Sequence, residues 1–503
     1  MRPGPIAAAL LVASLPLRLP NLGAPLLEGH GFRQTQTAIS VSAMLDEGIR
    51  LFDYQTPILG PPWRVPFELP VYQISAALLA TATRMPVDLA CRVTSLLYFY
   101  ASALLLYVLV RRCLGDGHAL ATLGVYAFSP FTIFWSRAAL IEWSVVAFGL
   151  GAILAADAFR ERPSPGAFVS AVALGALAWA VKLTTGPALL PPLVARLWPL
   201  ARRERRRAAT LALAAAIVVV PIACGYGWAR YADGVRAASP YTRPLSTAEL
   251  QSHLFGSLAE RLGAASWKAI GDFVGRFVTP GLAIGLLPLG LSGLRRLPAD
   301  GAAFVLSILA GLALPLLAFT HLYGRHDYYL CAIVPWLSVL AGAGLVALAG
   351  RIGARRWLWI PVVILLGGSM ITARSYGDAM LGTHDDNPIV VAGRAVAALT
   401  SPGDLVVVAD QSWSPALLYY AHRRGFMLYR FEGDECNAFL RAARFATVVS
   451  RQDHPKLFSA WGHRASVASV ASFDVSFVGD DDRALEQRVA AVRARLAPLN
   501  EPR

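Results

Sequence analysis

LLEGHGFRQTQTAISVSAMLDEGIRLFDYQTPILGPPWRVPFELP, residues 26–70, is a polar stretch inside a chain that is otherwise strongly apolar. It carries Glu28, His30, Arg33 and Glu68 between an N-terminal apolar segment and the first unmistakable spanning helix. Charged groups near a membrane core cost roughly 2.5 to 3.5 kcal/mol each on insertion scales, so they tend to mark paired or functional positions. We expect this segment to hold chemistry at the membrane surface.

The composition places the chain among polytopic membrane proteins. Of its 503 residues 56% are hydrophobic and 16% are charged, and the mean hydropathy is +0.50. The net charge of +14 comes from short basic clusters between apolar runs, which indicates the positive-inside pattern rather than a nucleic-acid partner. The five cysteines are scattered without metal-ligand spacing, so we predict neither a disulfide framework nor a zinc site.

Apolar runs of about 20 residues, the length needed to cross the hydrocarbon core, predict about eleven transmembrane helices. They cover residues 4–20, 89–110, 118–136, 142–159, 166–183, 186–200, 208–230, 270–293, 301–320, 329–349 and 357–373. The first run lacks a convincing small-residue cleavage site before Leu22, so we interpret it as a span rather than a signal peptide. Residues 66–84 are apolar too, but a crossing there would invert the later basic clusters, so we predict a juxtamembrane or re-entrant helix.

Alternate connections carry the arginine clusters, which predicts a consistent threading of the bundle. The clusters are Arg111 and Arg112, Arg160 and Arg162, Arg202 to Arg207, Arg295 and Arg296, and Arg351, Arg355 and Arg356. We assign that side to the cytoplasm, together with the N-terminus. The other side then receives the first loop (22–88), the loop from Tyr231 to Lys268 and everything after Arg374. In the first loop, residues 32–50 predict a surface helix with Ala38, Val41, Leu45 and Ile49 on one face.

The C-terminal part, residues 387–503, has the texture of a soluble α/β domain and follows a transmembrane domain of residues 1–373. We predict helices at 389–399, 415–422 and 482–496, and strands at 404–410, 426–430 and 445–450. The segment contains no glycine-rich phosphate loop and no nucleophile elbow. A structural or acceptor-docking role is therefore favoured over a second active site.

Several polar residues on the predicted outer side are candidates for chemistry, and each has a plainer explanation. Glu142 could favour a helix N-terminus or pair with Arg137, and Lys182 could be a snorkelling helix end. Glu68 could cap the helix that Pro70 begins.

The segment HLYGRHDYYL places Arg325, His326, Tyr328 and Tyr329 together. An interfacial belt explains its tyrosines but not the Arg-His pair. Together, the candidate residues offer a carboxylate as general base and cations for a leaving phosphate, the chemistry of glycosyl transfer from a lipid-phosphate sugar.

On these residues the chain resembles the GT-C superfamily of membrane glycosyltransferases, over about residues 15–373. Its likeness is to the bacterial branch similar to protein O-mannosyltransferases and lipid A aminoarabinose transferases. The matching positions are Glu68-Leu69-Pro70, Ala90-Cys91-Arg92-Val93, Glu142, Lys182, and the pair Tyr328 and Tyr329. The resemblance implies the GT-C fold and a polyprenyl-phosphate sugar donor.

One position departs from the pattern of many members. Where an Asp-Glu pair often begins the surface helix and helps to bind a divalent ion, this chain has Arg33-Gln34, as a recognisable sub-branch does. The nearest acid is Glu28, which would be a ligand if Mg²⁺ or Mn²⁺ is bound. Alternatively, Arg33 replaces the ion as the counter-charge of the phosphate.

The resulting hypothesis is an inverting glycosyltransferase of a bacterial inner membrane, acting on a glycolipid, a cell-envelope glycan or a protein at the outer face. Glu28 is the first choice for the base, with Glu142 and Glu68 as alternatives. The expected donor-phosphate residues are Arg33, Gln34, Lys182, Arg325, His326, Tyr328 and Tyr329, with His30 and Arg137 as further site residues. A transporter of lipid-linked sugars is the competing hypothesis, although we find no internal repeat; a scaffold is a third.

Overall fold

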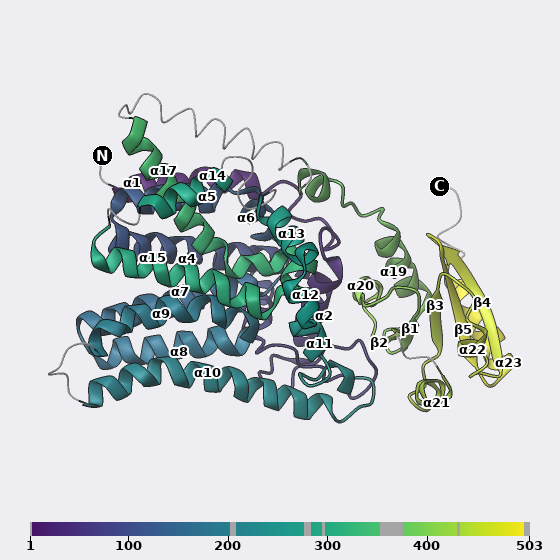
Figure 1. Cartoon of the computed structure of the whole chain (residues 1–503). Coiled ribbons are helices and arrows are strands. Elements are labelled where there is room, and N and C mark those ends of the chain that lie inside the picture. Colours follow the sequence, from purple (N-terminus) through teal and green to yellow (C-terminus); the bar gives the residue numbers. More distant parts are fainter. Residues whose placement is uncertain are drawn as a thin grey trace.

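The structure is a computed structural model that describes residues 3–201, 208–275, 283–293, 297–352, 374, 376–429 and 433–496. Most of these residues form an elongated bundle of helices, and a smaller domain that contains a sheet lies at one end of it (Figure 1). The predicted combination of a helical membrane domain and a C-terminal α/β domain is confirmed.

Five of the described helices are long and apolar enough to cross a membrane. They are α4 (Val87–Leu114), α7 (Glu142–Glu161), α10 (Ala208–Arg236), α15 (Ala299–Ala318) and α17 (Val334–Ile352). A sixth candidate consists of α8 (Pro165–Val181) and α9 (Gly186–Ala201), which meet at a bend of 113° around Lys182. The described residues thus hold fewer full-length spans than the eleven predicted, and that count is not confirmed.

Two predicted spans take a different form. Residues 4–20 form only the short α1 (Pro3–Ser14) and the turn η1 (Pro16–Arg18). Residues 118–136 divide into α5 (Asp116–Phe128) and α6 (Pro130–Trp135), because Pro130 has no backbone N–H for the preceding turn and instead begins a new helix.

The predicted span 270–293 overlaps two helices, α13 (Ala264–Phe273) and α14 (Ala283–Ser292), which lie on either side of a gap in the described residues. The predicted span 357–373 lies outside the described residues, as do the arginines at 202–207, 295–296 and 355–356.

The first loop contains two surface helices, α2 (Gly31–Glu47) and α3 (Val71–Thr83). The 13 residues of α3 extend over about 20 Å, shorter than a hydrocarbon core of about 30 Å, which is the length expected of a helix that does not cross. Ala38 and Val41 are buried on α2 as predicted. Leu45 is exposed and Ile49 lies beyond the end of α2, so the apolar face is shorter than predicted.

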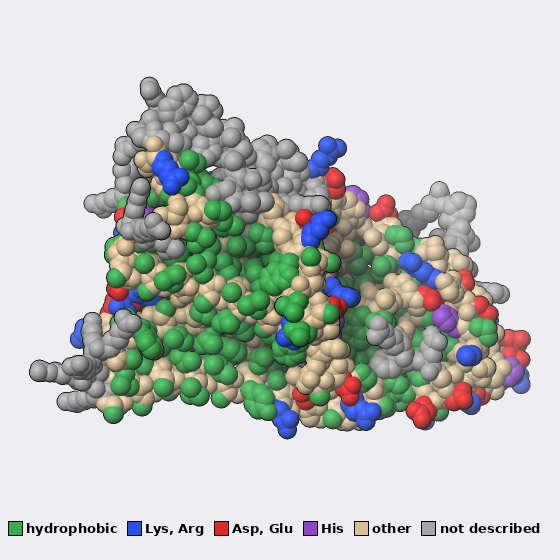
Figure 2. Space-filling view, in the orientation of Figure 1, with side chains coloured by type: hydrophobic (Ala, Val, Ile, Leu, Met, Phe, Trp, Pro, Cys, Tyr) green, Lys and Arg blue, Asp and Glu red, His purple; other side chains and the backbone are tan. Residues whose placement is uncertain are grey.

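The flank of the bundle is apolar. Figure 2 shows hydrophobic side chains covering it, whereas charged side chains gather toward the C-terminal domain. Large exposed hydrophobic residues of the bundle helices include Leu97, Val169, Val219 and Leu306. Such a surface suits contact with lipid.

The C-terminal domain is built on a five-stranded sheet with strand order β2-β1-β3-β5-β4. Strands β1 (Val406–Val408), β2 (Gly425–Met427) and β3 (Thr447–Ser450) are parallel, and β5 (Phe473–Gly479) runs antiparallel to β3 and to β4 (His463–Val470). Its helices are α19 (Pro388–Leu399), α20 (Ala416–Ala421), α21 (Asp434–Ala442), α22 (Pro455–Phe458) and α23 (Asp482–Leu496). The predicted helices and strands of this part are present, and the hairpin β4-β5 and the helix α21 are additional.

The first loop extends the sheet of the C-terminal domain. The amide of Met427 donates to the carbonyl of Ile58 at 2.9 Å, and the amide of Gly425 donates to Pro57 at 3.1 Å. The hydroxyl groups of Tyr419 and Tyr420 donate to Asp88 at the start of α4. The C-terminal domain is therefore fixed to the polar insert that the sequence singles out.

Candidate functional site

Glu142 and Lys182 form an ion pair between the first residue of α7 and the bend after α8. The Nζ of Lys182 donates to Oε1 of Glu142 at 2.5 Å, and the two side chains are 11% and 3% exposed. The other oxygen, Glu142 Oε2, is buried and makes no hydrogen bond. Glu142 therefore has one carboxylate oxygen held in place and a second that is buried without a hydrogen bond.

The pairing of Glu142 with Arg137, considered from the sequence, is wrong. Arg137 instead donates to the backbone carbonyls of Pro20 and Asn21. Its role is to hold the start of the first loop, because its guanidinium is buried against that segment.

Two tyrosines cover the ammonium group of Lys182. Its Nζ lies 4.0 Å from the ring centroid of Tyr329 and 5.2 Å from that of Tyr328. The two rings stack on each other with centroids 4.8 Å apart. Aromatic faces attract a cation, so the two rings help to hold the ammonium group beside Glu142.

Arg33 and Glu68 form a second pair beside the first. Nη2 of Arg33, on α2, donates to Glu68 Oε2 at 3.0 Å, while Oε1 of Glu68 accepts from Gln73 at 2.7 Å. Burial alone lowers the pKa of Arg33, but the negative charge of Glu68 and contributions from Tyr328 and Glu142 outweigh it and raise the pKa above its ordinary value. Arg33 thus remains charged and belongs to the same electrostatic neighbourhood as Glu142.

Glu28 forms a different kind of pair. Both of its oxygens accept hydrogen bonds from Arg92, whose side chain is fully buried and also donates to the carbonyls of Ala24 and Pro25. With both oxygens engaged, Glu28 has the geometry of a residue that anchors the first loop to α4. A buried ion pair of this type holds one conformation and is costly to break.

Gln34 is likewise occupied by the protein itself. Its amide nitrogen donates to the carbonyls of Glu28 and Gly29 at 2.6 and 3.0 Å, and its oxygen accepts from the backbone of Ala139 at 2.8 Å. The side chain is fully buried. The structure therefore joins α2 to the segment before α7 through Gln34 and does not direct this side chain toward an open position.

The HLYGRHDYYL segment contributes residues from the end of α16 (Thr320–Arg325) and from the turn η6 (Asp327–Ala332). Nε2 of His30 lies 3.1 Å from Asp327, and the His30 ring is 5.2 Å from that of His326. Burial, followed by the positive charges of His30, His253 and Lys182, lowers the pKa of His326 to about 4. His326 is therefore neutral near pH 7 and offers a hydrogen bond rather than a positive charge.

Arg325, which the sequence predicts to bind the donor phosphate, points away from the site. Its side chain is 64% exposed and lies 3.9 Å from Glu260, outside the cluster of Arg33, Glu142 and Lys182. Asp327, by contrast, was not selected from the sequence although it accepts from His30 and from the hydroxyl of Tyr376. Its only sequence signal is its place between His326 and Tyr328.

Glu28, the predicted ligand of a divalent cation, and the neighbouring carboxylate of Glu68 are already engaged. Glu28 uses both oxygens on Arg92, and Glu68 uses its oxygens on Arg33 and Gln73. Over the part of the chain that the structure describes, no three His, Cys, Asp or Glu side chains are grouped to hold a metal. The donor set as arranged does not fit a divalent ion, and we derive no step through one.

Comparison with known proteins agrees with this architecture. A family model described as dolichyl-phosphate-mannose-protein mannosyltransferase matches residues 70–228, which include Arg92, Glu142 and Lys182. No curated protein matches the chain by sequence. Solved structures with the same overall arrangement are GT-C-fold proteins, so the chain has the fold of the GT-C membrane glycosyltransferases, and the resemblance inferred from its motifs is confirmed.

Within that class the chain is similar to ArnT from Cupriavidus metallidurans, solved bound to undecaprenyl phosphate. The match has a TM-score of 0.64 at 15% identity and covers 93% of this chain and 97% of ArnT. Archaeal oligosaccharyltransferase AglB from Archaeoglobus fulgidus, solved with an inhibitory peptide and a dolichol-phosphate, matches with a TM-score of 0.54 at 12% identity over 89% and 69%. The arabinofuranosyltransferase AftD from Mycobacteria matches with a TM-score of 0.54 at 16% identity, over 95% of this chain and 40% of AftD.

Proposed function

We propose that the protein is an inverting glycosyltransferase that takes a sugar from a polyprenyl-phosphate carrier. The observation that carries this proposal is the buried, unpaired oxygen of Glu142 next to the cations Lys182 and Arg33. The fold shared with ArnT, which was solved with undecaprenyl phosphate, supports a lipid phosphate as the ligand of the cations.

Glu142 is the residue that best fits the general base. Of the three carboxylates proposed from the sequence, Glu28 and Glu68 have both oxygens in hydrogen bonds within the protein. Glu142 has one oxygen held by Lys182 and one that is buried without a partner. A base must be able to accept the proton that it removes, and this supports Glu142 rather than Glu28 as the proposed base, with Glu28 as an anchor of the loop.

The proposed reaction is a single displacement at the anomeric carbon. The acceptor hydroxyl gives its proton to Glu142 Oε2 while its oxygen bonds to the anomeric carbon of the sugar. The bond from that carbon to the phosphate oxygen breaks, and its electron pair stays on the polyprenyl phosphate that leaves. Because attack and departure occur on opposite faces of the sugar, the configuration inverts.

The leaving phosphate is stabilised by Lys182 and Arg33, which in this structure pair with Glu142 and Glu68. Lys182 turns from Glu142 to the phosphate, and Arg33 grips it with two hydrogen bonds while remaining charged. Tyr328, Tyr329 and neutral His326, whose rings contact one another, offer aromatic faces and hydrogen-bonding groups beside these cations. Glu68 remains held by Gln73 through its other oxygen.

We place this site on the outer face of a bacterial inner membrane, with the C-terminal domain on the same side and the N-terminus in the cytoplasm. The acceptor is then a glycolipid, a cell-envelope glycan or a protein at that face. Cysteines introduced near Asp53 and near Arg451 should react in intact spheroplasts, whereas one near Arg162 should be protected. The reverse labelling pattern would refute this orientation.

The proposal is tested by supplying purified protein with polyprenyl-phosphate sugars and analysing products by mass spectrometry. The glycolipids, envelope glycans and glycoproteins of a deletion strain identify the acceptor, since one class should lose a sugar and regain it on complementation. A strain that accumulates a complete but untranslocated lipid-linked glycan, with no missing glycosidic bond, would instead indicate a transporter.

A further inference from the structure

The opposite end of the bundle holds an ion network that the proposed reaction does not use. Asp157, fully buried on α7, accepts from Arg160 at 2.9 Å, from Nε of Arg196 on α9 at 2.8 Å, and from Arg112 on α4 at 3.3 Å. The ends of three helices are thereby tied together around one carboxylate. Glu161 also lies within ion-pair distance of Arg112 and Arg160, so three arginines face two carboxylates.

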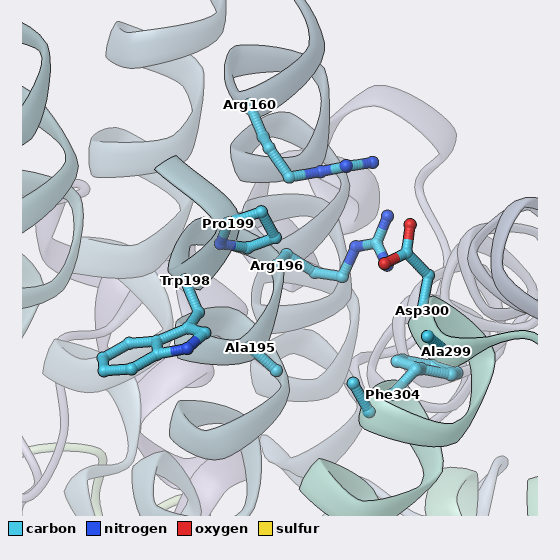
Figure 3. A pocket seen from close by; sticks show the side chains of 9 residues that line it. Arg160, Ala195, Arg196, Trp198, Pro199, Ala299, Asp300 and Phe304 are labelled. Atoms are coloured by element: carbon cyan, nitrogen blue, oxygen red, sulfur yellow. The ribbon is translucent and has the colours of Figure 1, made fainter. Parts of the chain in front are cut away.

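A cavity of about 360 Å³ opens beside this network, where α7 and α9 end and α15 begins. Its polar wall consists of Arg160, Arg196 and Asp300, and its apolar wall includes Trp198, Pro199 and Phe304. Figure 3 shows the guanidinium of Arg196 directed toward the carboxylate of Asp300, with Arg160 beside them and Trp198 on the far side of α9.

The charges that face the cavity are unevenly screened. The side chains of Arg160 and Arg196 are only 16% and 8% exposed. The nearby acids Glu161 and Asp300 lie in more exposed positions, so water and salt weaken their fields more than those of the two arginines. The inner wall therefore presents a net positive surface to a small anion, although the rim is acidic.

We propose that this cavity binds the phosphate of an anionic phospholipid headgroup. Basic pockets between transmembrane helices at the arginine-rich side are suited to such headgroups. Arg160 and Arg196 already give Nε and Nη2 to Asp157, so they would bind the phosphate through their charge and their Nη1 groups. Trp198 is 55% exposed at the same level, as expected for an aromatic residue at the headgroup layer. The exposed apolar side chain of Leu306, further along α15, continues the surface toward the acyl chains.

This site is separate from the proposed donor site and does not depend on it. The donor residues are at the end of the bundle that carries the first loop, whereas the arginines of this cavity are at the termini of α7 and α9. The bound lipid would stabilise the packing of α4, α7, α9 and α15, since Asp157 already joins three of these helices. Loss of lipid binding at this cavity would not contradict the glycosyltransferase proposal. Failure of the glycosyltransferase proposal would likewise not contradict lipid binding at this cavity.

The test measures the thermal stability of the full-length protein in detergent as phosphatidylglycerol, phosphatidylcholine or inorganic phosphate is added, with native mass spectrometry to count retained lipids. Phosphatidylglycerol should raise the Tm of the parent protein more than either alternative. Arg160→Gln should weaken the apparent phosphatidylglycerol affinity about tenfold, the effect of losing one charged hydrogen bond. Asp300→Asn should strengthen the affinity, because it removes a negative charge without disturbing the Asp157 network.

The matched control is Arg111→Gln, which removes one positive charge at the same end but from an exposed pair with Asp116. It should leave phosphatidylglycerol binding unchanged. Equal loss of binding in Arg111→Gln and Arg160→Gln would overturn the proposal, as would equal stabilisation of the parent by inorganic phosphate or by phosphatidylcholine. Weaker phosphatidylglycerol binding in Asp300→Asn would contradict the assignment of an anionic headgroup, even if Arg160→Gln failed to fold.

Discussion

The two ends of the bundle both contain buried carboxylates paired with cations, and they differ in what the pairing leaves open. At the arginine-rich end, both oxygens of Asp157 accept hydrogen bonds from arginines. At the first-loop end, Glu142 has one oxygen on Lys182 and one without a partner. A saturated carboxylate fixes a conformation, whereas a half-satisfied one beside movable cations can exchange partners with a substrate.

The same contrast exists within the first-loop end, between Glu28 and Glu142. Glu28 resembles Asp157 in this respect, because both of its oxygens accept hydrogen bonds from Arg92. Residue type alone does not separate an anchor from a base. The predictions below test whether the distinction drawn from hydrogen bonding holds, beginning with the largest expected effect.

Breaking the Glu28 anchor should cost the most stability. Arg92→Met leaves a buried carboxylate without its partner, and we expect about 3–5 kcal/mol of destabilisation, measured by denaturation in detergent. The double change Glu28→Leu with Arg92→Met should be less damaging than the sum of the single changes. If Glu28→Gln instead retains the parental Tm and abolishes transfer, Glu28 is the base and the contrast with Glu142 fails.

Arg33 should have a large effect on the rate of transfer rather than on folding. Arg33→Ala removes a donor to the leaving phosphate and should lower transfer about 100- to 1,000-fold. Arg33→Lys should recover little of this, because it keeps the charge but loses the paired hydrogen bonds. Arg50→Ala, an exposed arginine of the same loop, is the matched control and should behave as the parent.

The metal question is settled by the same assay with EDTA. Because Arg33 provides the counter-charge, transfer should persist in EDTA. Abolition by EDTA with rescue by Mg²⁺ or Mn²⁺, together with near-normal activity of Arg33→Ala, would return the role to a cation held by acidic residues of the first loop.

Part of this arrangement could be predicted from local sequence pattern. Long apolar runs predict α4, α7 and α10, and short alternations predict the strands β1 and β3, because both patterns are set by residues that are neighbours in the chain. Glu142 and Lys182 could be selected as costly polar residues in apolar surroundings. The sequence therefore indicated Glu142 and Lys182 as candidates, but it did not indicate that they pair with each other.

Partners that are distant in the chain could not be predicted. Glu142 and Lys182 are 40 residues apart, and Glu28 and Arg92 are 64 apart. No local pattern tells which acid meets which base, so Arg137 was considered for Glu142 and Glu28 was preferred as the catalytic residue. Pro130 shows that a local feature can also change the outcome, because this proline inside an apolar run divides one predicted span into two helices.

The smallest expected effect is the pH dependence of stability due to His326. Its pKa is lowered to about 4 in the folded protein by burial and neighbouring positive charges, against about 6.5 when unfolded. As pH falls from about 6.5 toward 4, the unfolded state gains a proton that the folded state does not, so stability is lost over this window. The Tm of His326→Gln should fall less between pH 7 and pH 5 than the parental Tm.

The exposed His384 provides the control for that comparison. His384→Gln should retain the parental slope of Tm against pH. Identical slopes for His326→Gln and the parent would show that His326 is not held neutral by the cluster around Lys182.

The most direct test of the account compares the two ends of one helix, because α7 begins at Glu142 and ends at Glu161. Both residues are changed to glutamine, and transfer from a polyprenyl-phosphate sugar is measured with each folded variant. Glu142→Gln should lower the rate about 100- to 10,000-fold, the range for loss of a general base, while Glu161→Gln transfers at the parental rate. Parental transfer by folded Glu142→Gln would contradict the assignment of the base and, with it, the central claim.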